Sequence, residues 1–170
     1  MIKEKIHTIF EEIRQLSSEQ QRLWFTKILQ EVAVYYQAFS EENLFGDPTF
    51  FDRVVYLVKK PTPTPTAIQT LRQELEREGM IPDTEEYGTL SASLCINSCV
   101  IADYILQFLD TQKSEILEKI IESHFEIAEM LYGKDLEENL RPVAWESLLC
   151  AQPDFKHFIQ KQEERIQAIR

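Results

Sequence analysis

Glycine and cysteine are scarce in this 170-residue sequence, which contains only 4 glycines and 3 cysteines. An odd number of cysteines does not suggest the disulfide framework of a small secreted protein. No stretch of about 18 consecutive apolar residues is present, so no transmembrane helix is expected. The N-terminus also lacks the apolar run of a signal peptide. Together these absences predict a cytoplasmic protein that does not interact with membranes.

Positive charge is also in short supply. The chain has 29 acidic and 18 basic side chains, which give a formal net charge of −11. Because an acidic surface repels phosphate backbones, nucleic-acid binding is not expected. The excess of acid is consistent with a basic protein partner, or simply with solubility.

The sequence has none of the compact motifs that mark common catalytic sites. It lacks a Gly-rich phosphate loop, a His-Glu-x-x-His metal motif and a Gly-x-Ser-x-Gly nucleophile motif. Only 3 histidines are present, and they are far apart in the sequence. No cofactor is expected. An enzyme is not indicated, although the sequence does not exclude one.

What the sequence does contain is helical periodicity. Apolar residues recur at steps of three and four through most of the chain, beginning with Ile2, Ile6 and Ile9. No alternating β-strand pattern competes with this periodicity. With 44% hydrophobic residues, a chain of this length can bury a core without disulfides or metal. We therefore predict an all-α single domain over residues 1–170, with about seven to eight helices.

Two segments differ from the amphipathic pattern. Residues 89–109 are apolar on every side of a helix, which predicts a central helix buried all round and surrounded by the other helices. Residues 60–66 alternate proline and threonine, which predicts a stiff, extended surface connector. The alternative for this connector is a ligand for a proline-recognising domain, but it lacks an aromatic anchor pattern.

Cysteine and histidine provide one set of candidate ligands. Cys95 and Cys99 lie four residues apart, on one face of the predicted central helix. His124 falls on the apolar stripe of the next helix and is expected to point inward. If these helices are antiparallel neighbours, the three side chains could bind zinc, with Cys150 as a fourth ligand. The spacing differs from that of zinc knuckles, however, and buried thiols with a hydrogen-bonded core histidine are the simpler interpretation.

Polar residues in the central helix provide a second set of candidates, of which Asn97 and Asp103 are the main ones. A buried Asp103 needs a hydrogen bond or a cation, and perturbed carboxylates are frequent at functional sites. It is therefore a candidate general base or, more simply, the partner of a helix end, a lysine or an arginine. With His124, these residues define a candidate pocket for a small ligand.

Acidic residues form a regular ridge on the same helix as His124. They recur at steps of three and four, opposite the apolar stripe, at Glu115, Glu118, Glu122, Glu126 and Glu129. A di-iron bundle would need a Glu-x-x-His motif, but Ile121 stands three residues before His124. The ridge is thus either a solvated face or a docking surface for a basic partner.

Several short segments occur in a characteristic order. They are Phe45-Gly46-Asp47, the aromatic and aliphatic helix at 50–58, Tyr87-Gly88 ahead of Cys99-Val100-Ile101-Ala102, and residues 137–142 ahead of Trp145-Glu146. In these segments the chain resembles the YjaG-like family of bacterial proteins, a family with a domain of unknown function. The resemblance implies an all-helical bundle and brings no catalytic residues with it.

The sequence supports two functional hypotheses. The favoured one is a non-enzymatic interaction or regulatory protein that presents its acidic helical surface to a basic partner. Its hydrophobic content leaves a homodimer open. The alternative is an enzyme, or a binder of a metal or small ligand, with a site near Asn97, Asp103, His124 and the cysteines.

Overall fold

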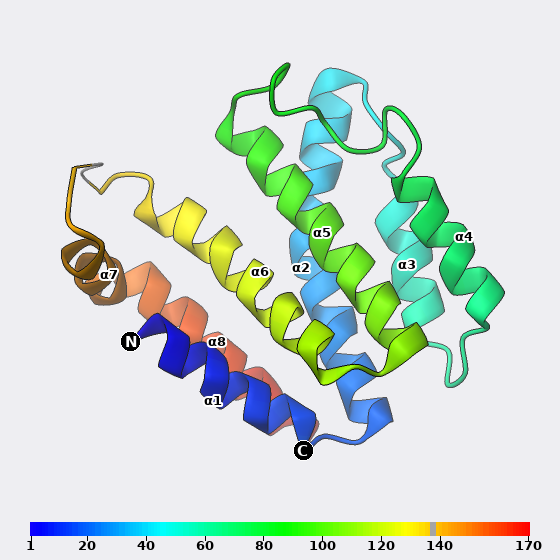
Figure 1. Cartoon of the computed structure of the whole chain (residues 1–170), viewed down its shortest axis with the longest axis horizontal. Helices are drawn as coiled ribbons and strands as arrows, with labels where there is room; N and C mark the ends of the chain where they lie inside the picture. Colours follow the sequence, from blue (N-terminus) through cyan, green and yellow to red (C-terminus); the bar gives the residue numbers. More distant parts are fainter. Residues whose placement is uncertain (137–138) are drawn as a thin grey trace.

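A computed structural model describes residues 1–136 and 139–170, in which the chain forms eight helices (Figure 1). They are α1 (Ile2–Arg14), α2 (Ser18–Asn43), α3 (Phe50–Val58), α4 (Pro65–Leu75), α5 (Leu90–Thr111), α6 (Ser114–Gly133), α7 (Pro142–Ala151) and α8 (Pro153–Ile169). The described residues contain no β-strand, and the predicted all-α bundle is confirmed. Residues 137 and 138, which belong to the last segment of the YjaG-like resemblance, lie outside the described residues.

Short-range side-chain contacts set where several helices begin. The Ser17 hydroxyl accepts a hydrogen bond from the Gln20 N–H (3.2 Å), and the Gln20 side chain accepts one from the Ser17 N–H (2.9 Å), so α2 starts with a capping box. Thr64 caps α4 in a similar way, with Pro65 as the first helical residue. The predicted connector at 60–66 is therefore too long, because its last two residues belong to α4.

The central helix α5 contacts α2, α3, α4 and α6. Figure 1 shows it in front of α2 and α3, with α4 on one side and α6 on the other. The prediction that this helix is buried all round is wrong. Ser93, Asn97, Val100 and Tyr104 follow one face of α5 and are only half-buried. At Tyr104 this face lies between α4 and α6, because Tyr104 lines a cavity with Arg72 of α4 and Lys119 of α6 lies over its ring.

By length and composition alone, α5 is a helix that could cross a membrane, and among the described residues it is the one that meets this test. The core helices of folded domains meet it as well. In this structure 56% of the most apolar part of α5 is buried inside the bundle. Its hydrophobicity is thus accounted for by the four helices that pack against it.

A second group of helices covers the opposite face of α6. Helices α1 and α8 lie side by side and both contact α6, while α8 also contacts α2 (Figure 1). Three buried aromatic rings, Phe125, Phe155 and Phe158, fill the space between α6 and α8, with two of the three ring pairs edge to face. Helix α7 joins this group at its end and contacts α6 and α8.

Tyr36 fixes the loop that follows α2. Its buried hydroxyl accepts a hydrogen bond from the Asp47 N–H (3.2 Å) and donates one to the Met80 carbonyl oxygen (3.1 Å). Burial raises the pKa of Tyr36 to about 12, so the hydroxyl stays protonated and able to donate. The chain passes this hydroxyl at Gly46, where φ is +65° and a Cβ atom would overlap the tyrosine oxygen. Only glycine fits there.

This arrangement predicts different costs for alanine at two glycines with positive φ. Gly46→Ala adds both left-handed strain and overlap with Tyr36, so we expect a loss of about 2–4 kcal/mol in the free energy of unfolding. At Gly79, φ is +83° but the space is open, and we expect Gly79→Ala to cost only about 1 kcal/mol. Urea unfolding of both variants measures the difference. Equal losses would show that Tyr36 does not restrict position 46.

Candidate functional site

Asn97, Asp103 and His124 have three different sets of contacts. The half-buried Asn97 donates a hydrogen bond to the Ser93 carbonyl oxygen at 3.0 Å, within its own helix. Asp103 faces α4, where its Oδ1 lies 2.7 Å from Arg72 Nε. His124 faces α2 and α8. The structure therefore does not bring these three residues into one pocket.

Asp103 has the kind of partner that the simpler interpretation requires. Arg72 contacts both carboxylate oxygens, with Nη2 3.4 Å from Oδ2, and the hydrogen bond to Asp103 raises the pKa of Arg72. The pair lies beside a shallow cavity of about 320 Å³ that Cys99 and Tyr104 also line. Asp103 therefore joins α4 to α5 through a two-point ion pair.

The cysteines do not form a metal centre with His124. Cys95 and Cys99 are fully buried next to each other, and their hydrogen bond together with burial raises the pKa of the Cys99 thiol. Cys150 is half-buried on α7. Within residues 1–136 and 139–170, no group of three or more His, Cys, Asp or Glu side chains is placed to hold a metal. The alternative zinc set is therefore not assembled, because His124 points away toward α2 and α8.

His124 belongs instead to a charge network centred on Glu31, in which His124 is buried, Glu31 and Arg165 are half-buried and Lys161 is exposed. Its Nε2 lies 3.1 Å from Glu31 Oε1, and its ring packs edge-on against Phe158 at 5.0 Å between centroids. The other oxygen of Glu31 contacts Arg165 and, at 3.2 Å, the Lys161 Nζ atom. This Glu31 network ties α2, α6 and α8 together through one carboxylate.

The two titratable groups at the centre of the Glu31 network are both displaced from their ordinary behaviour. Burial alone would raise the pKa of Glu31, but hydrogen bonds and charge from His124 and Arg165 hold it well below its usual range. Burial lowers the pKa of His124 by more than Glu31 raises it. A neutral imidazole and an ionised carboxylate are therefore the folded-state forms near neutral pH.

The sign of the His124 shift predicts how stability depends on pH. As the pH falls below the ordinary histidine value of 6.5, the unfolded chain takes up this proton before the folded one does. The stabilisation from a neutral His124 is thus complete above that value and is lost as the pH falls. We expect His124→Gln, which keeps an N–H toward Glu31 but cannot titrate, to lose less stability than the parent between about pH 7.5 and 5.5.

Urea unfolding at both pH values measures this difference. Because the variants share the same carboxylates, the contribution of these groups to the pH dependence of the free energy of unfolding cancels in the comparison. His157→Gln is the matched control because His157 is exposed. It should keep the parent's pH dependence. An unchanged dependence in His124→Gln would contradict a displaced His124 pKa.

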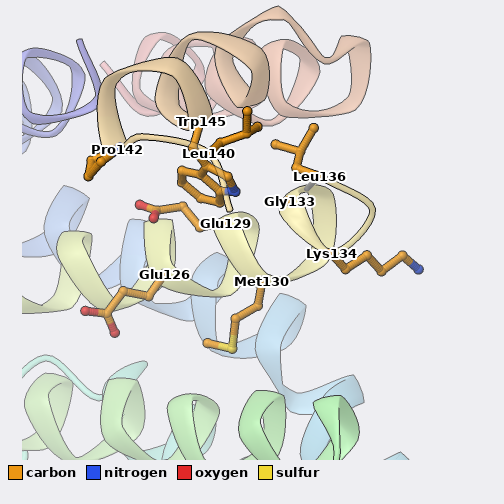
Figure 2. A pocket seen from close by; sticks show the side chains of 9 residues that line it. All are labelled: Glu126, Glu129, Met130, Gly133, Lys134, Leu136, Leu140, Pro142 and Trp145. Carbon is orange, nitrogen blue, oxygen red and sulfur yellow. The ribbon is translucent and has the colours of Figure 1, made fainter. Parts of the chain in front are cut away.

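A groove lies where the acidic ridge meets α7 (Figure 2). It encloses about 620 Å³ and is lined from α6, the following loop and α7 by Glu126, Glu129, Met130, Gly133, Lys134, Leu136, Leu140, Pro142 and Trp145. We call it the α6–α7 groove. Its floor is mostly apolar and aromatic, and two glutamates of the ridge form its acidic edge.

The structure divides the predicted ridge into two parts. Glu115, Glu118, Glu122 and Glu126 are exposed, and Glu129 is half-buried. Of these, Glu126 and Glu129 border the α6–α7 groove. Burial raises the pKa of Glu126, with a further contribution from Glu122. Burial also raises the pKa of Glu129, and the charges of Glu126 and Glu146 add to it. Glu126 and Glu129 therefore each lie near other carboxylates, whose negative charge disfavours their ionised forms.

Within residues 1–136 and 139–170, no basic side chain neutralises this edge. In the described part of the chain, neither Glu126 nor Glu129 forms a salt bridge. Lys134 lines the same groove, but Figure 2 shows its side chain extending away from both glutamates. The groove therefore combines unneutralised acid with apolar surface.

Trp145 packs against α6 at Gly133, where the absence of a side chain leaves room for the indole ring. A Cβ atom at Gly133 would lie 2.7 Å from Trp145 Cζ2, which is closer than atoms pack. The next residue, Glu146, accepts a hydrogen bond from the Ile2 N–H at 2.6 Å and lies 3.3 Å from the Met1 ammonium nitrogen. These contacts fix α7 between α1 and the end of α6, and so give the α6–α7 groove its second wall.

Gly133→Ala should therefore displace Trp145. We expect a loss of about 1–3 kcal/mol in the free energy of unfolding from the forced repacking and a shift in tryptophan emission. The chain has 2 tryptophans, so the measurement uses a Trp24→Phe background in which Trp145 is the reporter. Gly88→Ala, at an open position, is the control. An unshifted emission in Gly133→Ala would contradict the contact.

Comparison with known proteins agrees with this architecture. A family model described as a protein of unknown function, DUF416, matches residues 8–169. The fold is similar to the crystal structure of a DUF416 family protein from Shewanella baltica OS155, with a TM-score of 0.82 and 18% sequence identity, covering 94% of this chain and 83% of that chain. No curated protein matches the sequence. The predicted membership in a family of unknown function is confirmed, and the chain belongs to the DUF416 family.

Proposed function

We propose that this protein is a non-enzymatic interaction module that binds a basic segment of a partner protein in the α6–α7 groove. The observation that supports this proposal is the groove's composition. Two crowded carboxylates, unneutralised within the described residues, lie beside an apolar floor with a half-buried tryptophan. A segment that pairs a lysine or arginine with a neighbouring apolar side chain matches both parts.

The charge of the partner is inferred from the raised pKa values of Glu126 and Glu129. The loss of surrounding water is the main cause of each raised pKa, and repulsion by the charge of a neighbouring glutamate adds to it. A cation placed between them would remove that repulsion and favour the charged forms, so binding and ionisation support each other. An acidic side chain in the partner would instead increase the repulsion between carboxylates. The groove therefore selects against acidic segments as well as for basic ones.

The apolar character of the partner is inferred from α7. This helix carries hydrophobic residues on most of its sides, but among them only Leu149 is fully buried. Val143 is 76% exposed and Leu148 is 45% exposed. Neither residue lines the α6–α7 groove itself, where Trp145 and Met130 provide the aromatic and flexible apolar surface that is enriched at protein interfaces.

The outer part of the ridge has a different role in this proposal. Glu115, Glu118 and Glu122 are exposed on the same helix as the groove's acidic edge, and the whole chain has a net charge of −11. Exposed charges of this kind contribute little to affinity, because water and salt screen them. They accelerate the approach of a basic partner and bias its orientation.

The alternative function, an enzyme or small-ligand binder near Asn97, Asp103 and His124, has less support. These residues do not share a cavity, and the cavity beside Asp103 is about 320 Å³, at the lower limit for ligand pockets. We also propose that the protein is cytoplasmic and that its relation within the family is the narrower YjaG-like one. A second copy of this chain, bound to the α7 face in a homodimer, is the competing occupant. Sedimentation during a peptide titration distinguishes a homodimer from a complex with the peptide.

The test uses a synthetic helical peptide in which lysines and leucines share one face, titrated into the Trp24→Phe protein while Trp145 emission is followed. We expect Glu126→Gln with Glu129→Gln to weaken binding about tenfold, because one exposed and one partly buried ion pair are lost. Glu115→Gln with Glu118→Gln removes the same charge from the far end of the ridge. This control should change the affinity by less than about twofold.

Two results would contradict the proposal. One is an equal loss in both double variants, which would mean that the peptide responds to net charge alone. The other is binding of a matched peptide with glutamate in place of each lysine. Sedimentation at several protein concentrations accompanies the titration. A dimer that dissociates when the peptide binds would identify a second copy as the natural occupant.

A further inference from the structure

A smaller crevice lies between the first turns of α2 and the chain that leaves α3. It encloses about 240 Å³ and is lined by Glu19, Arg22, Leu23, Thr26, Lys59 and Pro61. We call it the α2–α3 crevice. It shares no residue with the α6–α7 groove, so a ligand bound in this crevice would be independent of the basic partner proposed for that groove.

Thr26 gives the α2–α3 crevice an unusual wall. The residue is only 7% exposed, and its buried hydroxyl has no hydrogen-bond partner among the described residues. Hydroxyls inside helices commonly bond to the carbonyl oxygen four residues earlier. Five others in this chain do so at 2.8–2.9 Å: Thr8, Thr70, Ser98, Thr111 and Ser147. Thr26 does not use that partner, and a buried hydroxyl without one is costly.

Arg22 is a second unsatisfied group in the same lining. Four arginines of the described chain are half-buried: Arg22, Arg53, Arg72 and Arg165. The other three each form a salt bridge with a carboxylate. Arg22 forms none within the described residues, although Glu19 lies one turn away in the same lining. Its guanidinium is therefore free to bind an anion from solution.

Lys59 adds a second positive charge across the crevice. It belongs to the end of α3 and meets the α2 side chains because the two helices pack together. The neighbouring Lys60 is used differently, since its Nζ lies 4.6 Å from the centre of the Tyr56 ring. The lining thus holds two cations, one unpaired hydroxyl donor and the apolar surfaces of Leu23 and Pro61.

We propose that the α2–α3 crevice binds a small phosphate monoester. Two cations match the two negative charges of a monoester, and the arginine fork fits two phosphate oxygens at once. The Thr26 hydroxyl is closed off from solvent in the free protein, so its side chain must rotate toward the crevice before the hydroxyl donates to the phosphate and gains the partner that it lacks. Leu23 and Pro61 contact the organic part. Glu19 repels any further anionic group, so polyphosphates and nucleic acid are disfavoured, in agreement with the net charge of −11.

Calorimetric titration with phenyl phosphate tests this proposal, with inorganic phosphate and benzoate as separate arms. We expect phenyl phosphate to bind best, inorganic phosphate more weakly because it lacks the organic part, and benzoate least. Arg22→Gln should lower the affinity for phenyl phosphate about tenfold or more. Lys27→Gln, which removes an equal charge at an exposed position of α2 outside the lining, should leave it within about twofold.

Thr26→Val separates a ligand-binding hydroxyl from a structural one. Valine has nearly the same shape, so in the absence of ligand the variant should be as stable as the parent or more stable, since an unpaired buried hydroxyl is removed. Its affinity for phenyl phosphate should nevertheless fall several-fold. The proposal is overturned if phenyl phosphate does not bind at millimolar concentrations, if benzoate binds equally well, or if Thr26→Val binds like the parent.

Discussion

The burial of α5 is the constraint on which the rest of the structure depends. Its inner residues, among them Cys95, Ile101, Ile105 and Leu106, are completely removed from water, and each large apolar side chain so buried contributes about 1.5–3 kcal/mol. Four helices must turn their apolar stripes toward α5 to achieve this. Because α6 uses one side against α5 and another against α1 and α8, its acidic residues are left on the surface that remains.

The α1–α8 group is attached to this core by a different means. The Glu31 network joins α2, α6 and α8 at one carboxylate, while Phe125, Phe155 and Phe158 fill the apolar space around it. Breaking a partly buried pair such as Glu31–Arg165 is costly, because water reaches the remaining charge only in part. Helix α7 has no comparable anchor. It is held by Leu149, by the contact of Trp145 with Gly133 and by the Glu146 contact with the N-terminus. Because α7 is apolar and contacts the rest of the fold at few points, part of its apolar surface remains available to bind another molecule.

Local pattern predicted most of the fold. Helices were visible because apolar residues at steps of three and four bury one face, and this rule needs no knowledge of the neighbours. It failed for the outer face of α5, because composition alone does not show that Val100 and Tyr104 lie in the angle between α4 and α6. The inward direction of His124 and the need of Asp103 for a cation were predicted from their own helices.

The partners of those residues could not be predicted. Glu31 is 93 residues from His124 and 134 residues from Arg165 in the sequence, and no periodicity links positions so far apart. The α6–α7 groove was missed for the same reason, since its acidic edge belongs to α6 and its aromatic wall to α7. The sequence shows only that α7 is apolar on most of its sides. This pattern indicates that the helix packs against something, but not against what.

Unpaired charge does not have the same meaning at the two sites. With 29 acidic side chains against 18 basic ones, one-to-one pairing must leave at least 11 acidic groups without a partner, so an unpaired glutamate on the surface says little. Glu129 becomes informative because it is half-buried beside apolar surface, where its charge is costly, and Glu126 because its charge lies next to Glu129 in the same groove. For Arg22 the argument is reversed. Carboxylates are abundant in this chain, and a half-buried arginine without one, beside a buried hydroxyl that also lacks a partner among the described residues, departs from what the composition favours. The same excess of acid that makes the α6–α7 groove suited to a cation therefore makes the α2–α3 crevice stand out as a place for an anion.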